Sequence, residues 1–156
     1  MPGAIAQDCL WFLDTLVTVR VSEREGSDHI SVLEHHAPHG DSPPLHVHRA
    51  EDEIFVVLEG AFRFQVGETE RAVAAGETIL APKGVPHTYR VESKEGGRWL
   101  TITSGGDFER FVRAMSRRAE RVELPERGGP PSAQAAEALA AEAARHGIEL
   151  VGPPLN

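Results

Sequence analysis

Apolar and polar residues alternate in short segments through the first two thirds of the chain, which is the period of a β-strand with one buried face. Glycine, proline and acidic residues separate these segments, as expected of turns. Between residues 45 and 81 no helical period interrupts the alternation. The segments are 11–22, 29–37, 45–49, 53–59, 61–67, 70–75, 77–82, 87–93 and 98–104. Short strands spaced this closely predict an antiparallel sandwich or barrel, so we expect an all-β fold.

The pattern changes after Ser104, where a helical period begins. Four apolar residues recur at helical spacing between charged ones: Phe108, Phe111, Val112 and Met115. We expect Asp107 to cap this helix. An alanine-rich segment predicts a second helix from Ser132 to about His146, ended by Gly147.

The chain has 156 residues, which suits one domain with a substantial core. We expect residues 1–104 to form a β-barrel and residues 105–156 to form a helical extension packed on it. Proline and glycine make residues 124–131 a linker between the two predicted helices. Alanine buries little surface, so the second helix needs Leu139 and the apolar tail to dock on the barrel.

Side-chain parity predicts that one further surface is covered. Five residues are expected to face the interior together: His46, His48, Glu53, Phe55 and Val57. The opposite face then carries five apolar residues: Leu45, Val47, Ile54, Val56 and Leu58. Because this face is too apolar to be left in water, either the two helices or a second copy of the chain is expected to cover it. We expect a homodimer.

Composition narrows the classes of partner. The formal net charge is −8, so nucleic acid and anionic membranes are not expected partners. Residues 1–14 lack the basic start of a secretory signal, and no apolar run approaches the ~20 residues of a membrane span. Cys9 is the single cysteine, which excludes an internal disulfide and fits a reducing compartment. We therefore expect a cytoplasmic protein.

Residues that can bind a metal stand on the predicted strands. His46 and His48 are two apart, so both imidazoles point to the same side of one strand. Glu53 begins the next strand. A fourth ligand is expected from His87, which follows a tight Pro-Lys-Gly turn. Three imidazoles and one carboxylate suit a divalent first-row metal with positions left for water or substrate.

The two segments that carry these residues resemble the two motifs of the cupins. The first motif is met by five residues: Gly40, His46, His48, Glu53 and Gly60. The second is met by four residues: Gly76, Pro82, Gly84 and His87. Val91 stands where the second motif has asparagine, a departure that touches no ligand. The resemblance covers roughly residues 11–104.

The resemblance implies a jelly-roll barrel, the double-stranded β-helix of cupins, with one divalent transition metal held inside by His46, His48, Glu53 and His87. Iron, manganese, nickel, cobalt, copper and zinc all fit these ligands. The C-terminal segment is similar to that of small cupins described as quercetin 2,3-dioxygenase-like. It implies a dioxygenase that uses O₂ and a small aromatic or enolic substrate, with Glu53 as proton acceptor. The alternatives are a non-oxidative isomerase, cyclase or lyase, and a small-molecule binding protein without turnover.

Other residues are weighed for the cavity. Tyr89 shares the parity of His87, so we expect it to line the cavity. Phe55 and Phe64 would favour an apolar or aromatic substrate where they face the metal. Three histidines precede the proline-rich turn and are expected to be exposed or outside the ligand set, although His36 can approach the site from a neighbouring strand: His35, His36 and His39. Two carboxylates beside the ligands are expected to be solvated or to lie just outside the ligand set: Glu51 and Asp52.

Overall fold

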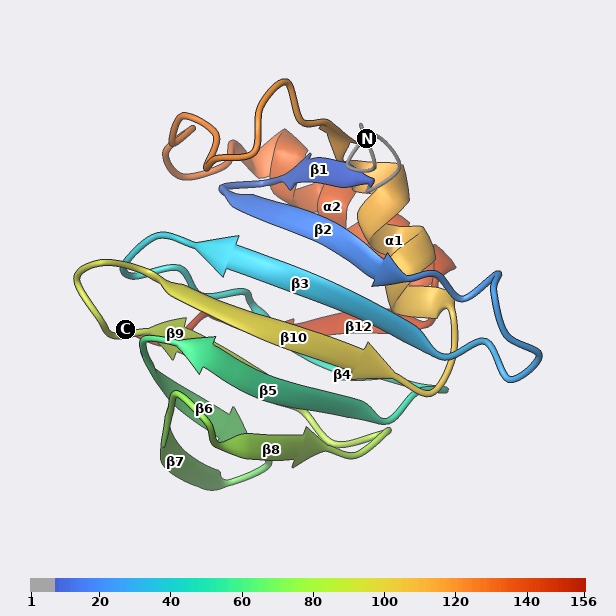
Figure 1. The fold of residues 1–156 in the computed structure, drawn as a ribbon, viewed down its shortest axis with the longest axis horizontal. Helices are drawn as coiled ribbons and strands as arrows, with labels where there is room; N and C mark the ends of the chain where they lie inside the picture. The colour runs from blue at the N-terminus through green and yellow to red at the C-terminus, as the bar shows by residue number, and fades with distance from the viewer. Residues whose placement is uncertain (1–7) are drawn as a thin grey trace, which may run out of the picture.

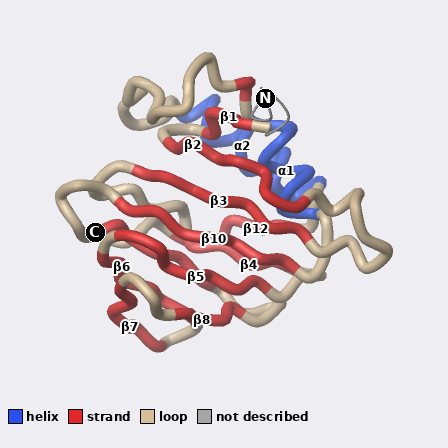
Figure 2. Tube along the Cα trace, in the orientation of Figure 1, coloured by secondary structure: helices blue, strands red, loops and turns tan. Residues whose placement is uncertain are grey.

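Two antiparallel sheets face each other across one interior in the computed structural model, which describes residues 8–156 (Figures 1 and 2). One sheet has the strand order β11-β1-β2-β3-β10-β5-β8, and the other has the order β12-β4-β9-β6-β7. This arrangement confirms the predicted all-β jelly-roll barrel with two helices. Part of the N-terminal segment judged not to be a secretory signal, residues 1–7, lies outside the described residues.

The elements have the following bounds. The strands before the first helix are β1 (Cys9–Phe12), β2 (Thr15–Val21), β3 (Ser31–Ala37), β4 (Leu45–His48), β5 (Glu53–Glu59), β6 (Ala61–Val66), β7 (Thr69–Ala74), β8 (Thr78–Ala81), β9 (His87–Val91) and β10 (Gly97–Thr103). The remaining elements are α1 (Asp107–Met115), β11 (Arg117–Arg118), α2 (Ala133–Arg145) and β12 (Ile148–Gly152). Within the described part of the chain, neither helix is long and apolar enough to cross a membrane.

Aromatic side chains fill the interior between the sheets. The buried cluster consists of Ala37, Phe55, Val57, Phe62, Phe64, Val73, Ile79, Ala81, Val91 and Trp99. Phe62 and Trp99 meet edge to face with ring centroids 5.2 Å apart, a favourable arrangement for aromatic pairs. The inward positions of β5 and β6 supply this packing because successive strand residues point to opposite faces.

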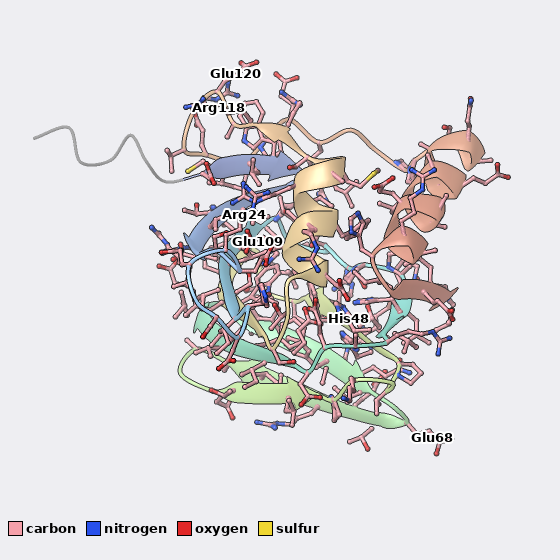
Figure 3. The ribbon with its side chains drawn as sticks, turned by 90° about the vertical axis from the view of Figure 1, so that its right-hand side faces the viewer. Arg24, His48, Glu68, Glu109, Arg118 and Glu120 are labelled. Atoms are coloured by element: carbon pink, nitrogen blue, oxygen red, sulfur yellow. The ribbon has the colours of Figure 1, made fainter. Side chains whose placement is uncertain are left out.

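Helix α1 closes one end of the barrel. Val112 packs with Val17 and Leu33 on the inner face of the large sheet. Glu109 is 1% exposed, and its carboxylate accepts hydrogen bonds from Ser22 Oγ and the Glu23 amide among others (Figure 3). These bonds tie α1 to the β2–β3 connection, because a buried carboxylate is stable only when its oxygens are paired.

The helix ends differ in how well the sequence predicted them. The N-cap of α1 is Gly106, without a side-chain cap, so the prediction that Asp107 caps the helix is wrong. The Asp107 carboxylate instead pairs with Arg110 at 2.8 Å. The second helix is as predicted: Ser132 accepts from the Ala135 amide, and Gly147 follows with φ +70°.

The C-terminal tail docks on the barrel as a strand. Strand β12 pairs with β4, the strand that carries His46 and His48, in antiparallel register. The sequence did not predict this strand, because Ile148–Gly152 is a segment of only five residues directly after a helix. The tail therefore extends the small sheet beside the candidate ligands.

The predicted reverse face is divided between the two sheets, because β4 and β5 lie in different ones. Val47 on β4 is 7% exposed, whereas Ile54 and Leu58 on β5 are 36% and 38% exposed. Both helices lie beside β1, β2 and β12, not over the centre of the large sheet (Figure 1). The apolar outer face of the large sheet is formed by Val32, Ile54, Val56, Leu58, Leu80, Leu100 and Ile102.

Candidate metal centre

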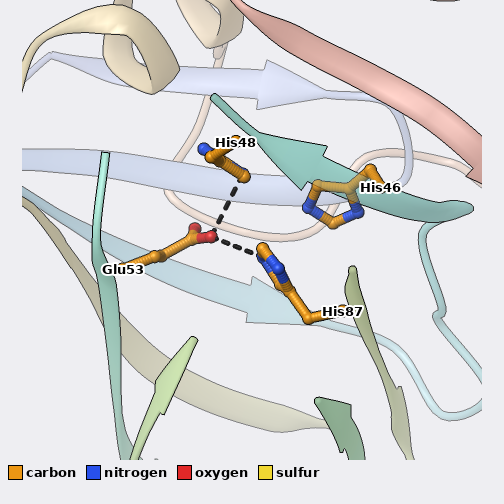
Figure 4. Close-up of side chains that lie close together, drawn as sticks. All are labelled: His46, His48, Glu53 and His87. Carbon is orange, nitrogen blue, oxygen red and sulfur yellow. Dashed lines mark hydrogen bonds and ion pairs between the residues drawn. The ribbon is translucent and has the colours of Figure 1, made fainter. Parts of the chain in front are cut away.

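Both sheets contribute to one polar cluster in the apolar interior (Figure 4). His46 and His48 lie on β4, and His87 begins the neighbouring strand β9, where it is the backbone partner of His46. Glu53 begins β5 in the opposite sheet. The structure thus brings together all four residues predicted as ligands, over a sequence separation of about 40 residues.

The donor atoms converge. One ligand atom from each residue lies within 4.8 Å of every other. Glu53 Oε2 is 2.8 Å from His87 Nε2 and 3.1 Å from His48 Nε2. Three of the residues are at most 2% exposed, and the His48 Nε2 atom has no aligned hydrogen-bond partner. A buried nitrogen left unpaired beside a carboxylate suits a metal ligand, because the ion would be its partner.

Hydrogen bonds fix the orientation of two of the rings. His46 Nδ1 is 2.8 Å from the Pro44 carbonyl oxygen, and His87 Nδ1 is 3.1 Å from the Val85 carbonyl oxygen. A carbonyl oxygen only accepts, so each Nδ1 carries hydrogen and donates. The Nε2 atoms of both rings are therefore directed at the cluster, as metal-binding imidazoles require.

Burial and neighbouring charge set the protonation of the cluster. Burial, followed by His87 and His48, lowers the pKa of His46 to about 3, so its imidazole is neutral at pH 7. Burial alone would raise the pKa of Glu53, but His48, His87 and His46 lower it to about 2. Burial opposes charge on His87, yet the Glu53 carboxylate raises its pKa. The carboxylate thus binds a positive charge at this position, which a divalent cation can supply in place of a proton.

The motif glycines hold the strands around the cluster. The Gly84 amide donates to the His48 carbonyl oxygen at 2.8 Å, linking the second motif to the first. Gly60 has φ +92°, and a Cβ there would lie 2.7 Å from the Gly96 carbonyl oxygen. Only glycine fits that position without displacing backbone.

Of the three aromatic residues predicted to line the cavity, Phe55 adjoins the cluster, and Phe64 and Tyr89 pack on Phe55. The rings of Phe55 and His87 have centroids 6.0 Å apart, and Phe64 and Tyr89 are 5.5 Å apart. The Tyr89 hydroxyl lies beside the Asp41 carboxylate, whose pKa burial raises to about 6. Contact of Tyr89, Phe55 and Phe64 with a substrate stays a prediction.

His36 lies away from the cluster, which corrects the expectation that it approaches the site. Its neighbour His35 points inward, so strand parity sends His36 to the outer face. There it lines a cavity of about 430 Å³ together with Glu34, Arg98 and others.

The sequence left open whether two residues near the cluster are exposed, and the structure buries both outside the ligand set. His35 is 3% exposed and stacks on Trp99 with centroids 4.8 Å apart, so of its two predicted places the exposed one is wrong and the one outside the ligand set holds. Its parity with Leu33 and Ala37 was the signal that could have placed it inside. Glu51 is 1% exposed, and burial raises its pKa to about 7. Its sequence position beside the exposed Asp52 gave no sign of this burial.

Comparison with known proteins confirms the resemblance read from the two motifs. Residues 32–103 match the cupin domain family. Quercetin 2,3-dioxygenase of Bacillus subtilis (strain 168) is 26% identical over 110 residues, which cover 70% of this chain. The match covers 32% of that enzyme, so this chain corresponds to about a third of its length.

Solved structures support the same fold. A predicted oxalate decarboxylase from Thermotoga maritima superposes with a TM-score of 0.57 and 17% identity, covering 66% of this chain and 95% of that one. KdgF from Halomonas sp. gives a TM-score of 0.54 and 16% identity, covering 62% and 84%. At these identities the likeness concerns the fold alone.

Proposed function

We propose that this chain, whose residues 32–103 match the cupin domain family, is a metal-dependent dioxygenase for a small aromatic or enolic substrate. The observation that carries the proposal is the convergence of His46, His48, Glu53 and His87 in an apolar, aromatic interior. The 26% identity to quercetin 2,3-dioxygenase favours an oxidative reaction over the other cupin chemistries.

The four residues fit one divalent transition metal. Neutral imidazoles and an ionised carboxylate are the forms that bind such ions, and the pKa values of His46 and Glu53 favour those forms at pH 7. When bound, the metal supplies Lewis acidity to a hydroxyl or enolate oxygen of the substrate and an open position for O₂. Iron, manganese, nickel, cobalt, copper and zinc all suit this donor set.

The chain's own residues would bind and deprotonate the substrate. Glu53 is the proposed proton acceptor for a substrate hydroxyl, because its carboxylate is ionised and buried at the cluster beside His48 and His87. Phe55 and Phe64 would pack on an aromatic ring and exclude water. Tyr89, whose hydroxyl lies beside Asp41, would orient a polar substituent of the substrate.

Oxygen consumption tests the reaction. Protein loaded with iron, manganese, nickel, cobalt, copper or zinc is mixed with quercetin, and O₂ uptake is followed beside product formation. We expect uptake with at least one metal, and none with His46→Ala/His87→Ala. Turnover under strict anaerobiosis would instead establish a non-oxidative isomerase, cyclase or lyase. Tight ligand binding without product would establish a binding protein.

We also propose that the chain is a cytoplasmic homodimer whose subunits meet at the apolar outer face. Support comes from its exposed residues on β5 and on the edge strand β8, since Ile54, Leu58 and Leu80 are 36%, 38% and 49% exposed. Ion pairs border this face, including Arg98 with Glu34 and Glu59. An apolar patch rimmed by charge is typical of a protein interface.

Residues 105–156 are proposed to belong to the same domain as the barrel. The pairing of β12 with β4 and the packing of α1 on β2 support this, because neither segment could bury its apolar face alone.

A further inference from the structure

Two buried polar atoms beside the metal centre lack hydrogen-bond partners and face each other. They are His48 Nδ1 and Glu51 Oε2, which lie 4.0 Å apart. Both side chains are at most 2% exposed, so bulk water cannot pair with them. Buried polar groups in native proteins are nearly always paired, which makes two adjacent unpaired atoms a feature that calls for a partner.

The other oxygen of Glu51 is already held by α1. Glu51 Oε1 accepts from the Phe108 amide at 2.9 Å, in the first turn of the helix. The first amides of a helix are unpaired within it and favour a carboxylate. Gly105 packs against the same side chain, where an added Cβ would lie 3.3 Å from Glu51 Cγ. Helix α1 therefore fixes the Glu51 carboxylate with its free oxygen on the side of His48, which lies close to α1 in Figure 3.

His48 differs from the other two histidines in what orients it. His46 and His87 each donate Nδ1–H to a backbone carbonyl oxygen. His48 Nε2 lies on the Glu53 side, 3.1 Å from Oε2, so its Nδ1 points away from the centre toward Glu51. No carbonyl oxygen takes that role for His48 among the hydrogen bonds of residues 8–156.

We infer that Glu51 is a positioning residue for the metal centre, whose Oε2 accepts a hydrogen bond from His48 Nδ1–H when His48 Nε2 binds the ion. The approach required is roughly 1 Å, from the present separation to an ordinary hydrogen-bond distance. A carboxylate in this position fixes the tautomer and the ring plane and makes Nε2 a stronger ligand. The inference rests on metal binding, which is part of the proposed function, and not on the reaction.

A matched pair of variants tests the inference. Glu51→Gln keeps the size of the side chain and an oxygen for the Phe108 amide, but removes the carboxylate. Asp52→Asn removes the same charge one residue away, on an exposed side chain that accepts from the Lys83 amide. Zinc is titrated into each metal-free protein against a competing chelator. We expect E51Q to bind zinc about 10- to 100-fold more weakly than wild type, and D52N to bind within about twofold.

Nuclear magnetic resonance of the imidazole nitrogens separates positioning from a merely structural role. In ¹⁵N-labelled wild type with zinc, we expect His48 Nδ1 to carry a slowly exchanging hydrogen at low field. In E51Q that resonance should move upfield and exchange faster, while those of His46 and His87 stay unchanged. The wild-type spectrum tests the inference even where E51Q does not fold.

Two results would overturn the inference and leave the proposed metal binding standing. One is a His48 Nδ1 that lacks hydrogen in the zinc-loaded wild type. The other is an E51Q that matches D52N in zinc affinity while wild type binds normally, which would leave the proposed function standing. Wild type and D52N that both fail to bind zinc and each of the other five metals would overturn the inference and the proposed metal function together.

Discussion

Ile148 is the backbone partner of His48 across the β12–β4 pair, although 100 residues separate them in the sequence. Its side chain is 2% exposed and packs in one cluster with Phe111 and Ala143 of the two helices. The strand that carries two candidate ligands is therefore supported on one edge by the C-terminal segment. A change that destabilises the C-terminal segment should therefore also disturb the positions of His46 and His48.

Replacing Ile148 with alanine tests this link. Because the side chain is buried between β12 and both helices, Ile148→Ala should lower the free energy of unfolding by about 2–5 kcal/mol, measured by urea titration. Val151→Ala on the same strand is the control: Val151 is 49% exposed, so its loss should cost less than about 0.5 kcal/mol. Equal effects of the two variants would show that β12 is not packed as described.

Metal content tests the ligand set directly. Protein purified without a metal-affinity column should hold close to one equivalent of a transition metal, measured by elemental analysis. His46→Ala and His87→Ala should each reduce the content, and the double variant should hold none, since two of the four candidate ligands are lost. His39→Ala is the control, because His39 is exposed and its ring pairs with the Ser93 carbonyl oxygen, away from the cluster. Full occupancy in the double variant would contradict the assignment.

His35 gives a prediction about pH. Burial lowers its pKa from 6.5 to about 4, so between these values the unfolded chain binds a proton that the folded chain does not. The contribution of His35 to stability is therefore complete above about pH 6.5 and is lost as the pH falls toward 4. His35→Phe removes this dependence and keeps the stack on Trp99.

The measurement is urea unfolding of metal-free protein at several pH values. The stability of His35→Phe relative to wild type should rise by roughly 1.4 kcal/mol per pH unit as the pH falls through this window. His35→Leu loses the aromatic stack, so it should be less stable than His35→Phe at every pH. Its stability relative to wild type should change with pH by the same amount as that of His35→Phe. Burial raises the pKa of Glu51 and Asp41, which changes both proteins alike and cancels in the difference. Parallel curves for wild type and His35→Phe would contradict a buried neutral His35.

Features that depend on the spacing of residues close in the sequence could be predicted. His46 and His48 share a strand face, and the second motif supplied His87, so the ligand set needed only strand parity and two short motifs. The strands from β4 to β10 followed from alternation bounded by turn residues. These features depend on neighbours within a few positions.

Features that depend on distant packing could not be predicted. Glu51 is buried because α1 folds over it, and its neighbour Asp52 remains exposed, so local sequence does not separate the two. Strand β12 exists because β4 offers a free edge, a relation between residues about 100 positions apart. The apolar residues opposite the ligands were predicted to form one surface, whereas β4 and β5 belong to different sheets. Side-chain parity along a strand does not tell which sheet the strand joins.

Association through the apolar outer face can be tested with one charge. Ile54 lies on this face between its register partners Ile102 and Leu80, so Ile54→Glu would bury a carboxylate in the proposed interface. In sedimentation velocity, wild type should be a dimer at micromolar concentration and Ile54→Glu a monomer with an unchanged circular dichroism spectrum. Val151→Glu places the same charge on an exposed position of the small sheet and should remain a dimer. A monomeric wild type would show that this face stays in water despite its composition, and a dimeric Ile54→Glu would move the interface elsewhere.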